Sequence, residues 1–193
     1  MSQGTAEAST GQPASAPEHA REAAVGAVAA PPVPLEERQR RFKAAMGRYP
    51  SGVAIVTTAD ASGDRWGFTA TSFCSVSMAP PLVLFCLAKS AQCHPAFLTA
   101  RSWVVHVAAA EQAELALRFA TRDADKFGGR RITPSTDGHP VLDGSCAVLE
   151  CTTRDRYDGG DHTIVVGEVT DAQVLGDRPV VYFQRDFRTL SAL

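Results

Sequence analysis

The chain has 193 residues, of which 45% are hydrophobic, enough for one globular domain with an adequate core. Its formal net charge of -2, without any arginine–lysine block, gives no electrostatic basis for nucleic-acid binding. No stretch approaches the roughly 20 apolar residues of a membrane helix, and the N-terminus lacks the pattern of a secretory signal, so we expect a cytoplasmic protein.

The cysteines and histidines give no indication of a disulfide framework or a metal site. The five cysteines lie in or beside apolar runs, without a C-x-x-C pair, and their odd number argues against a set of disulfides. The histidines of the folded part lack a ligand spacing such as H-E-x-x-H. We therefore expect reduced, mostly buried thiols and no bound metal.

Residues 1–34 predict a disordered tail, and residues 35–193 the folded domain. The tail is dominated by Ala, Pro, Ser, Gly and Glu and has no aromatic residue, so it buries too little apolar surface to offset its ordering entropy. An amphipathic targeting helix is the alternative, but one arginine against three glutamates disfavours it. From Leu35 the spacing of Phe42, Met46 and Tyr49 predicts a helix with one apolar face, ended by Pro50 and Gly52.

After this helix the pattern is mainly β. The expected strands and short helices are the strands 53–58, 65–73, 82–87, 102–107, 146–157, 163–175 and 180–183 and the helices 93–100 and 110–119. A turn at 60–64 makes the first two strands a hairpin, and 123–139 is expected to be loop. Six to seven strands joined by short turns predict an antiparallel barrel, whereas the βαβ alternation and the G-x-G-x-x-G motif of a dinucleotide fold are missing.

The stretch 67–77 is unusually rich in hydroxyl groups and small residues, and it precedes the apolar strand 82–87. Exposed backbone and hydroxyls beside a buried strand suit a planar ligand with a polar edge. An ordinary solvated strand and turn is the alternative interpretation.

Two further segments are candidates for holding a phosphate. Ser90 can cap a helix that starts nearby, with Lys89 beside it, and 126–130 is a basic, glycine-containing loop that can close on an anion. An ordinary capped helix and an ordinary solvated loop are the alternatives.

The turn 159–162 places Asp161 and His162 between two long strands. An imidazole with a carboxylate beside it suits charge sensing or proton relay, although Asp161 capping the turn and a solvated His162 is an equal alternative. A hydrolase triad is disfavoured because no G-x-S-x-G elbow is present.

In this order and spacing, the motifs of the chain resemble the flavin reductase-like family, the small reductase components of two-component flavin monooxygenases. The matching motifs, from about residue 38 to 190, are Arg48-Tyr-Pro-Ser-Gly-Val53, Gly67-Phe-Thr-Ala-Thr-Ser-Phe-Cys-Ser-Val-Ser77, Pro80-Pro-Leu82, Lys89-Ser90, Phe119-Ala120, Asp125-Lys-Phe127, Gly138-His-Pro-Val-Leu142, Leu149-Glu-Cys151, Gly160-Asp-His162 and Gly167-Glu-Val169. Each motif is weakly specific, and the series as a whole is strongly so.

The resemblance implies an antiparallel, Greek-key split β-barrel with a few short flanking helices, which forms a homodimer and binds FMN, or FAD. NADH or NADPH would be the hydride donor, and a flavin-dependent monooxygenase component would be the partner. The resemblance also implies that His162 and Asp161 are the catalytic pair, on the nicotinamide side of the flavin. The implied cofactor-binding residues are Ser51, Thr69, Ala70, Thr71, Ser72, Phe73, Ser75, Ser90, Lys126 and Phe127.

The sequence departs from the family pattern at three positions. Cys93 and His94 stand where the family often has a threonine and an aromatic residue, and a thiol is a poor donor to phosphate. Phe187 stands where a tyrosine is often found, so no hydrogen bond is expected from it.

We therefore predict an NAD(P)H-dependent flavin reductase. A flavin-binding electron carrier without turnover is one alternative. The other is a flavin-dependent oxidase of the pyridoxamine phosphate oxidase type, which would need a second basic pocket that the sequence does not reveal.

Overall fold

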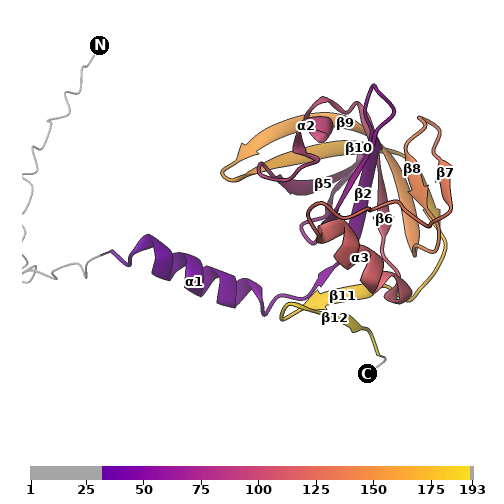
Figure 1. The fold of residues 1–193 in the computed structure, drawn as a ribbon. Helices are drawn as coiled ribbons and strands as arrows, with labels where there is room; N and C mark the ends of the chain where they lie inside the picture. Colours follow the sequence, from indigo (N-terminus) through magenta and orange to yellow (C-terminus); the bar gives the residue numbers. More distant parts are fainter. Residues whose placement is uncertain (1–31, 192–193) are drawn as a thin grey trace, which may run out of the picture. The chain divides into compact units, whose positions relative to one another are not determined.

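The computed structural model describes residues 32–191, which form a mainly β fold with few short helices, as predicted (Figure 1). The predicted disordered tail lies almost entirely outside the described residues, and its boundary with the domain stays a prediction. The chain divides into two units after Gln39, within the first helix, and the unit that begins at Arg40 contains all the strands of the described residues.

Twelve strands and four helical segments are assigned within the described residues. The strands are β1 (Ser51–Gly52), β2 (Ala54–Ala59), β3 (Arg65–Ala70), β4 (Cys74–Met78), β5 (Pro81–Ala88), β6 (Ser102–Val107), β7 (Ile132–Pro134), β8 (Pro140–Leu142), β9 (Ala147–Gly159), β10 (His162–Val174), β11 (Val180–Phe183) and β12 (Asp186–Thr189). The helices are α1 (Leu35–Met46), α2 (His94–Thr99), the 3-10 turn η2 (Ala110–Gln112) and α3 (Ala113–Ala120).

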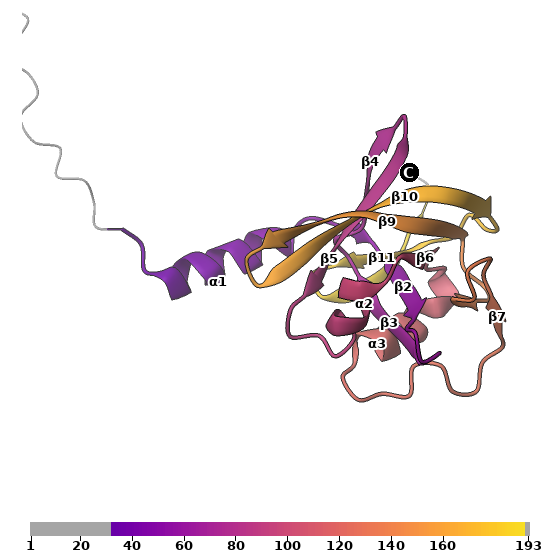
Figure 2. The ribbon, with the colours of Figure 1, turned by 90° about the horizontal axis from the view of Figure 1, so that it is seen from above.

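Seven strands form one antiparallel sheet in the order β3-β2-β6-β9-β10-β5-β4. The two longest, β9 and β10, pair along their whole lengths in its middle (Figure 2). Within the described chain β3 and β4 remain edges, so the sheet is antiparallel as predicted but is not closed into a barrel. Two small sheets, β1-β11-β12 and β7-β8, complete the β structure.

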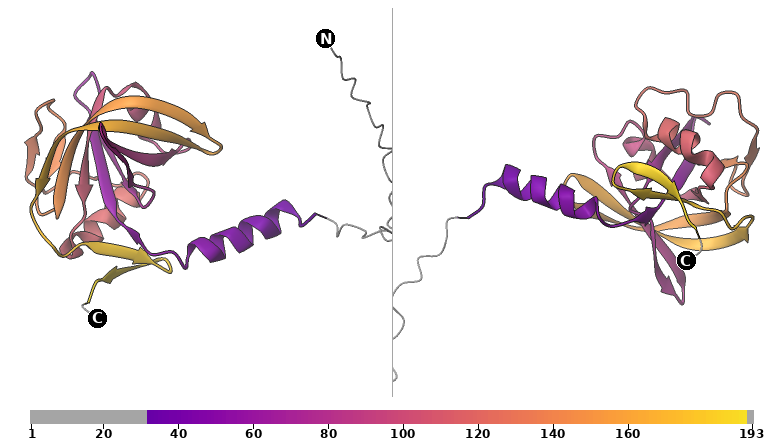
Figure 3. Two further views of the ribbon diagram at one scale, coloured as in Figure 1. Left: turned by 180° about the vertical axis from the view of Figure 1, so that it is seen from behind. Right: turned by 90° about the horizontal axis from the view of Figure 1, so that it is seen from below.

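The core lies on both faces of β2, because every residue from Ala54 to Thr58 is buried. One face packs on Phe85, Phe97 and Trp103, whose rings meet edge to face with centroids 4.9 to 5.8 Å apart. The other face packs on α3 and the strand β8. Helix α3 therefore lies against the sheet at β2 and β3 (Figure 3).

Some sequence expectations differ from the structure. The predicted strand 65–73 ends at Ala70, and the chain then starts the edge strand β4, which projects from the body in a hairpin with β5 (Figures 2 and 3). The predicted loop 123–139 contains β7, and β12 was not predicted because a strand of four residues gives little periodic signal.

The apolar face predicted for α1 is not buried in the chain. Phe42, Met46 and Tyr49 are all exposed, at 67%, 48% and 68%. Among residues 32–191, no helix combines the length and the apolar character needed to cross a membrane.

His106 is a buried structural link between two sheets. Its Nδ1 donates to the carbonyl of Ile55 at 3.0 Å, and its Nε2 accepts from the amide of Leu142 at 3.1 Å. The side chain has no exposed surface, and burial lowers its pKa from 6.5 to about 4. The neutral ring is the form that both hydrogen bonds require.

We predict that His106 makes the protein sensitive to acid. The unfolded chain binds a proton at this residue near pH 6.5, whereas the folded chain does not until about pH 4. The free energy of unfolding should therefore fall by roughly 3 kcal/mol as the pH drops through this window. Denaturant unfolding at several pH values measures the slope, which His106→Gln should flatten; an NMR titration that shows the wild-type ring protonating near pH 6.5 would contradict the prediction.

We also predict that Gly167 tolerates no side chain. A Cβ there would lie 2.3 Å from Cζ2 of the buried Trp103 and 3.0 Å from the carbonyl oxygen of Thr152. Gly167→Ala should cost about 1 to 3 kcal/mol or more of stability, because neither neighbour can move freely. Gly52→Ala, where nothing lies within 4 Å, is the matched control in thermal unfolding, and equal melting temperatures for the two variants would refute the argument.

Candidate functional site

A cavity of about 700 Å³ lies beside the open edge of β3. Its volume is within the range of small-molecule and cofactor sites. It is lined by residues 65–72, by 86–88 and 90–93, by 119–127, and by His162. Segments far apart in the sequence therefore meet around one hollow.

The structure brings most of the predicted site residues to this cavity. Those that line it are Thr69, Ala70, Thr71, Ser72, Ser90, Lys126, Phe127 and His162. Ser51 and Phe73 line a neighbouring cavity of about 600 Å³, which shares Thr71 and Ser72 with the first. Ser75 is exposed on β4 and lines neither, and Asp161 is connected to the site only through His162.

The hydroxyls of this segment serve mostly to fix the chain. Thr69 Oγ1 donates to the carbonyl of Ala116 at 2.6 Å, which ties β3 to α3. Ser72 Oγ donates to the carbonyl of Cys86 and accepts from its amide, at 3.2 and 3.0 Å. Both hydroxyls are bonded within the protein, and their role as flavin contacts stays a prediction.

The backbone of β3 remains available to a ligand. Within residues 32–191 the strand pairs with β2 alone, and all its residues from Arg65 to Ala70 line the cavity. An edge strand presents a row of backbone N–H and C=O groups that the sheet does not satisfy. These groups can bond the polar rim of a flat ring.

A close contact fixes the distance between β3 and α3. A Cβ at Gly67 would lie 2.6 Å from the ring of Phe119, so only glycine fits there. The Phe119 ring in turn meets Phe127 edge to face, with centroids 5.2 Å apart. The aromatic wall of the cavity thus depends on a glycine in the edge strand.

Lys126 places a positive charge in the wall of the cavity. Its Nζ donates to the carbonyls of Phe119 and Thr121, at 2.5 and 2.9 Å, and so closes the C-terminal end of α3. Burial lowers the pKa of this ammonium, which lies 5.8 Å from the centroid of the Phe119 ring. The neighbouring Cys93 stays a neutral thiol, since burial raises its pKa to about 11.

The predicted role of Ser90 as a helix cap is wrong. Helix α2 begins at His94, its N-cap is Cys93, and no side chain caps it. Ser90 lies in the preceding turn and still lines the cavity. The short helix with a proline in its first turn therefore offers no phosphate site at its start.

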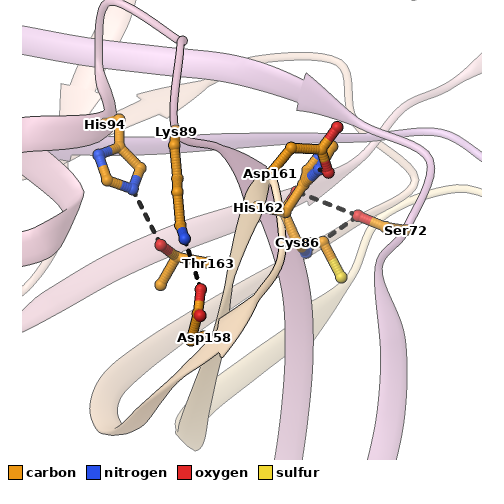
Figure 4. Close-up of polar contacts among 8 residues, drawn as sticks. All are labelled: Ser72, Cys86, Lys89, His94, Asp158, Asp161, His162 and Thr163. Carbon is orange, nitrogen blue, oxygen red and sulfur yellow. Dashed lines mark hydrogen bonds and ion pairs between the residues drawn. The ribbon is translucent and has the colours of Figure 1, made fainter.

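The turn between β9 and β10 is held by charged pairs, shown in Figure 4. His162 Nδ1 lies 2.7 Å from Asp161 Oδ1, and this hydrogen bond keeps the pKa of Asp161 below its usual value. Because the carboxylate is ionised, Nδ1 carries the proton and Nε2 remains for a ligand. Lys89 forms an ion pair with Asp158, and its amide donates to the carbonyl of Asp161 at 2.9 Å.

Sequence reasoning missed a pair that joins two sides of the cavity. Gln92 Nε2 donates to the carboxylate of Asp123, and the amide of Asp123 donates to Gln92 Oε1 at 3.0 Å. Asp123 adopts a left-handed backbone, with φ 59°. No sequence motif signals this contact, because the two residues are 31 positions apart and both belong to loops.

The basic loop 126–130 divides between two cavities. Lys126 and Phe127 line the first, whereas Gly128, Gly129 and Arg130 line a separate one. The described residues contain no group of three or more His, Cys, Asp or Glu side chains that could hold a metal ion.

Comparison with known proteins gives one family. Residues 46–191 match the model of the flavin reductase like domain. The chain is 46% identical over 153 residues to the actinorhodin polyketide dimerase of Streptomyces coelicolor, which covers 79% of this chain and 86% of that protein. It is 38% identical over 149 residues to HsaB, the reductase subunit of a flavin-dependent monooxygenase of Rhodococcus jostii, with 77% and 76% covered.

Two further similarities concern the cofactors. The chain is 43% identical over 140 residues to the FMN reductase (NADH) SmoA of Agrobacterium fabrum, with 72% and 79% covered. Among solved structures, it is similar to the NADH:FAD oxidoreductase SgcE6 of Streptomyces globisporus in complex with NAD and FAD fragments. That similarity has a TM-score of 0.76, 34% identity, and coverage of 84% of this chain and 98% of the other.

Proposed function

The chain belongs to the flavin reductase family, and on that premise we propose that it is an NAD(P)H-dependent flavin reductase that supplies reduced flavin to a partner monooxygenase. FMN is the proposed flavin, with FAD as the alternative, and NADH or NADPH is the hydride donor. The observation that carries the proposal is the cavity beside the open edge of β3, which Lys126 and His162 also line.

The residues present fit a flavin. Its ring has a polar rim and an apolar face, which suit the free backbone groups of β3 and the aromatic wall of Phe119 and Phe127. Its phosphate suits the ammonium of Lys126 and the hydroxyl of Ser90. Lys126 is already held by two carbonyls, so its charge is placed before any ligand arrives.

When bound, flavin and nicotinamide supply a direct hydride transfer between their rings. The protein has to hold the two rings in contact and shield them from water. Backbone N–H donors along β3 and the charge of Lys126 are placed to stabilise negative charge at the cavity. His162, oriented by Asp161, is proposed to lie on the nicotinamide side and to act through Nε2.

The oriented imidazole of His162 favours a flavin reductase over a flavin-binding electron carrier without turnover. An electron carrier needs no oriented imidazole beside its ring, whereas a reductase must position a second substrate there. Ser51 and Phe73, in the neighbouring cavity, and the exposed Ser75 stay predictions as cofactor contacts.

The assembly proposed with this function is a homodimer of split β-barrels in the cytoplasm. The projecting edge strand β4 exposes Val76 and Met78, at 51% and 87%, and an exposed apolar edge strand favours pairing with another chain. The five cysteines of the chain are all free thiols, which suits a reducing compartment.

We predict that the purified protein oxidises NADH in air when FMN is added, at a rate that rises with free flavin. Absorbance at the nicotinamide band, with FMN, FAD, NADH and NADPH in all pairs, measures the preference. An absorption spectrum of the protein as purified shows whether flavin stays bound. Tight flavin binding without turnover on either nicotinamide would favour the carrier, and absence of flavin binding would exclude both.

We predict that His162→Ala lowers kcat/KM for NADH about ten- to a hundredfold and changes the Kd for FMN by no more than about twofold. The imidazole is proposed to act at the nicotinamide, so flavin binding should not depend on it. His94→Ala is the control, because His94 bonds Thr163 at 2.9 Å and does not line the cavity. Equal loss of FMN binding and of turnover would show that His162 is structural.

A further inference from the structure

A second cavity, of about 520 Å³, is lined by three arginines that the proposed reductase chemistry does not use. Arg118 comes from the outer side of α3, and Arg130 and Arg131 come from the loop before β7. Gly128, Gly129 and a single carboxylate, Asp143, complete the polar lining. The sequence does not reveal this basic pocket, because the arginines that line it come from two separated segments of the chain.

Three guanidinium groups share this cavity with one carboxylate, that of Asp143, so its lining carries a net positive charge. None of the ion pairs in the described chain includes Arg118, Arg130 or Arg131. The hydrogen bond of Arg118 is a long one, 3.5 Å to the carbonyl of Gly128. Like charges that share one hollow repel each other, so a bound anion would stabilise this arrangement.

One position in the lining of this cavity, Gly129, leaves room for a ligand to reach the backbone. Gly129 has φ 70°, and nothing lies within 4 Å of the place where a Cβ would be. Gly128 is held by its amide, which donates to Asp125 Oδ1 at 2.8 Å. Open backbone at Gly129 beside the arginines suits an anion with several oxygens, because arginine bonds phosphate through two parallel N–H groups.

The same two segments, α3 and the loop that follows it, line both cavities. Phe119 and Phe127 line the first cavity and contact each other. Their chain neighbours Arg118 and Gly128 line the second and also contact each other. Along the loop, 122–127 face the first cavity and 128–131 the second.

We propose that the arginine-lined cavity binds the diphosphate of an adenine nucleotide, as the ADP half of a dinucleotide whose redox ring occupies the first cavity. FMN carries one phosphate, for which Lys126 and Ser90 suffice, so three further cations point to a ligand with more phosphate. The arginines of the lining carry the binding of a diphosphate, whereas its assignment to the ADP half of a dinucleotide rests on the proposed function.

ADP titrated into the full chain by calorimetry is the direct test. Neutralising two charges with Arg130→Gln/Arg131→Gln should raise the Kd for ADP at least about tenfold, since each lost charge-assisted bond is costly. Arg154→Gln/Arg188→Gln removes the same charge from two ion-paired arginines that line neither cavity, and should leave the Kd for ADP within about twofold. All the arginines changed are exposed, so equal melting temperatures confirm that the variants fold.

Turnover then identifies which dinucleotide supplies the ADP half. If the ADP half belongs to FAD, Arg130→Gln/Arg131→Gln weakens the binding of FAD and leaves the binding of FMN unchanged. If the ADP half belongs to the hydride donor, the same double variant raises the KM for NADH or NADPH with FMN as acceptor. The proposal is overturned if wild-type protein does not bind ADP, if both double variants lose ADP equally, or if pyridoxamine 5′-phosphate competes better than ADP. Absence of FMN reduction by wild type, with ADP binding intact, would instead refute the reductase assignment alone.

Discussion

Strand β3 pairs with β2 along one side, and its other side carries backbone groups that no strand of the described chain satisfies. The proposed site depends on this unpaired edge, because flat ligands with polar rims bond to such groups. The edge stays in place because β2 is buried on both faces and Thr69 bonds the carbonyl of Ala116 in α3. Burial of one strand thus fixes the exposed backbone of its neighbour.

Helix α3 connects the edge to the charges around it. Its Phe119 packs against Gly67, its C-terminal carbonyls hold Lys126, and its Arg118 faces a second cavity. One helix of eight residues therefore contributes to the aromatic wall, to the position of the ammonium and to the arginine-lined cavity. Phe119 and Arg118 lie on the helix itself, whereas Lys126, Arg130 and Arg131 come from the loop that follows, so the helix fixes one side of each cavity and the loop supplies the other.

Part of the site could be predicted from the sequence. The two long strands and the short turn between them gave the position of Asp161 and His162, and the small residues before Pro80 marked the segment along the cavity. The helix expected over 93–100 is found over His94–Thr99, but its cap was wrongly assigned to Ser90, because serine is a good cap in isolation. The hydrogen bonds of Thr69 and Ser72 to carbonyls of the chain could not be predicted, because a sequence does not show which carbonyl lies nearest to a hydroxyl, and their contact with a flavin stays a prediction.

The sequence by itself determined the mainly β, antiparallel class, the family and part of the segments that line the cavity, because periodicity and motif spacing are local properties that survive without coordinates. Only the tertiary structure decided which strand remains an open edge, that Gln92 meets Asp123, and that Arg118 joins Arg130 and Arg131 around one hollow. These features arise from contacts between distant segments, and their energies depend on distance and burial, which no residue pattern encodes.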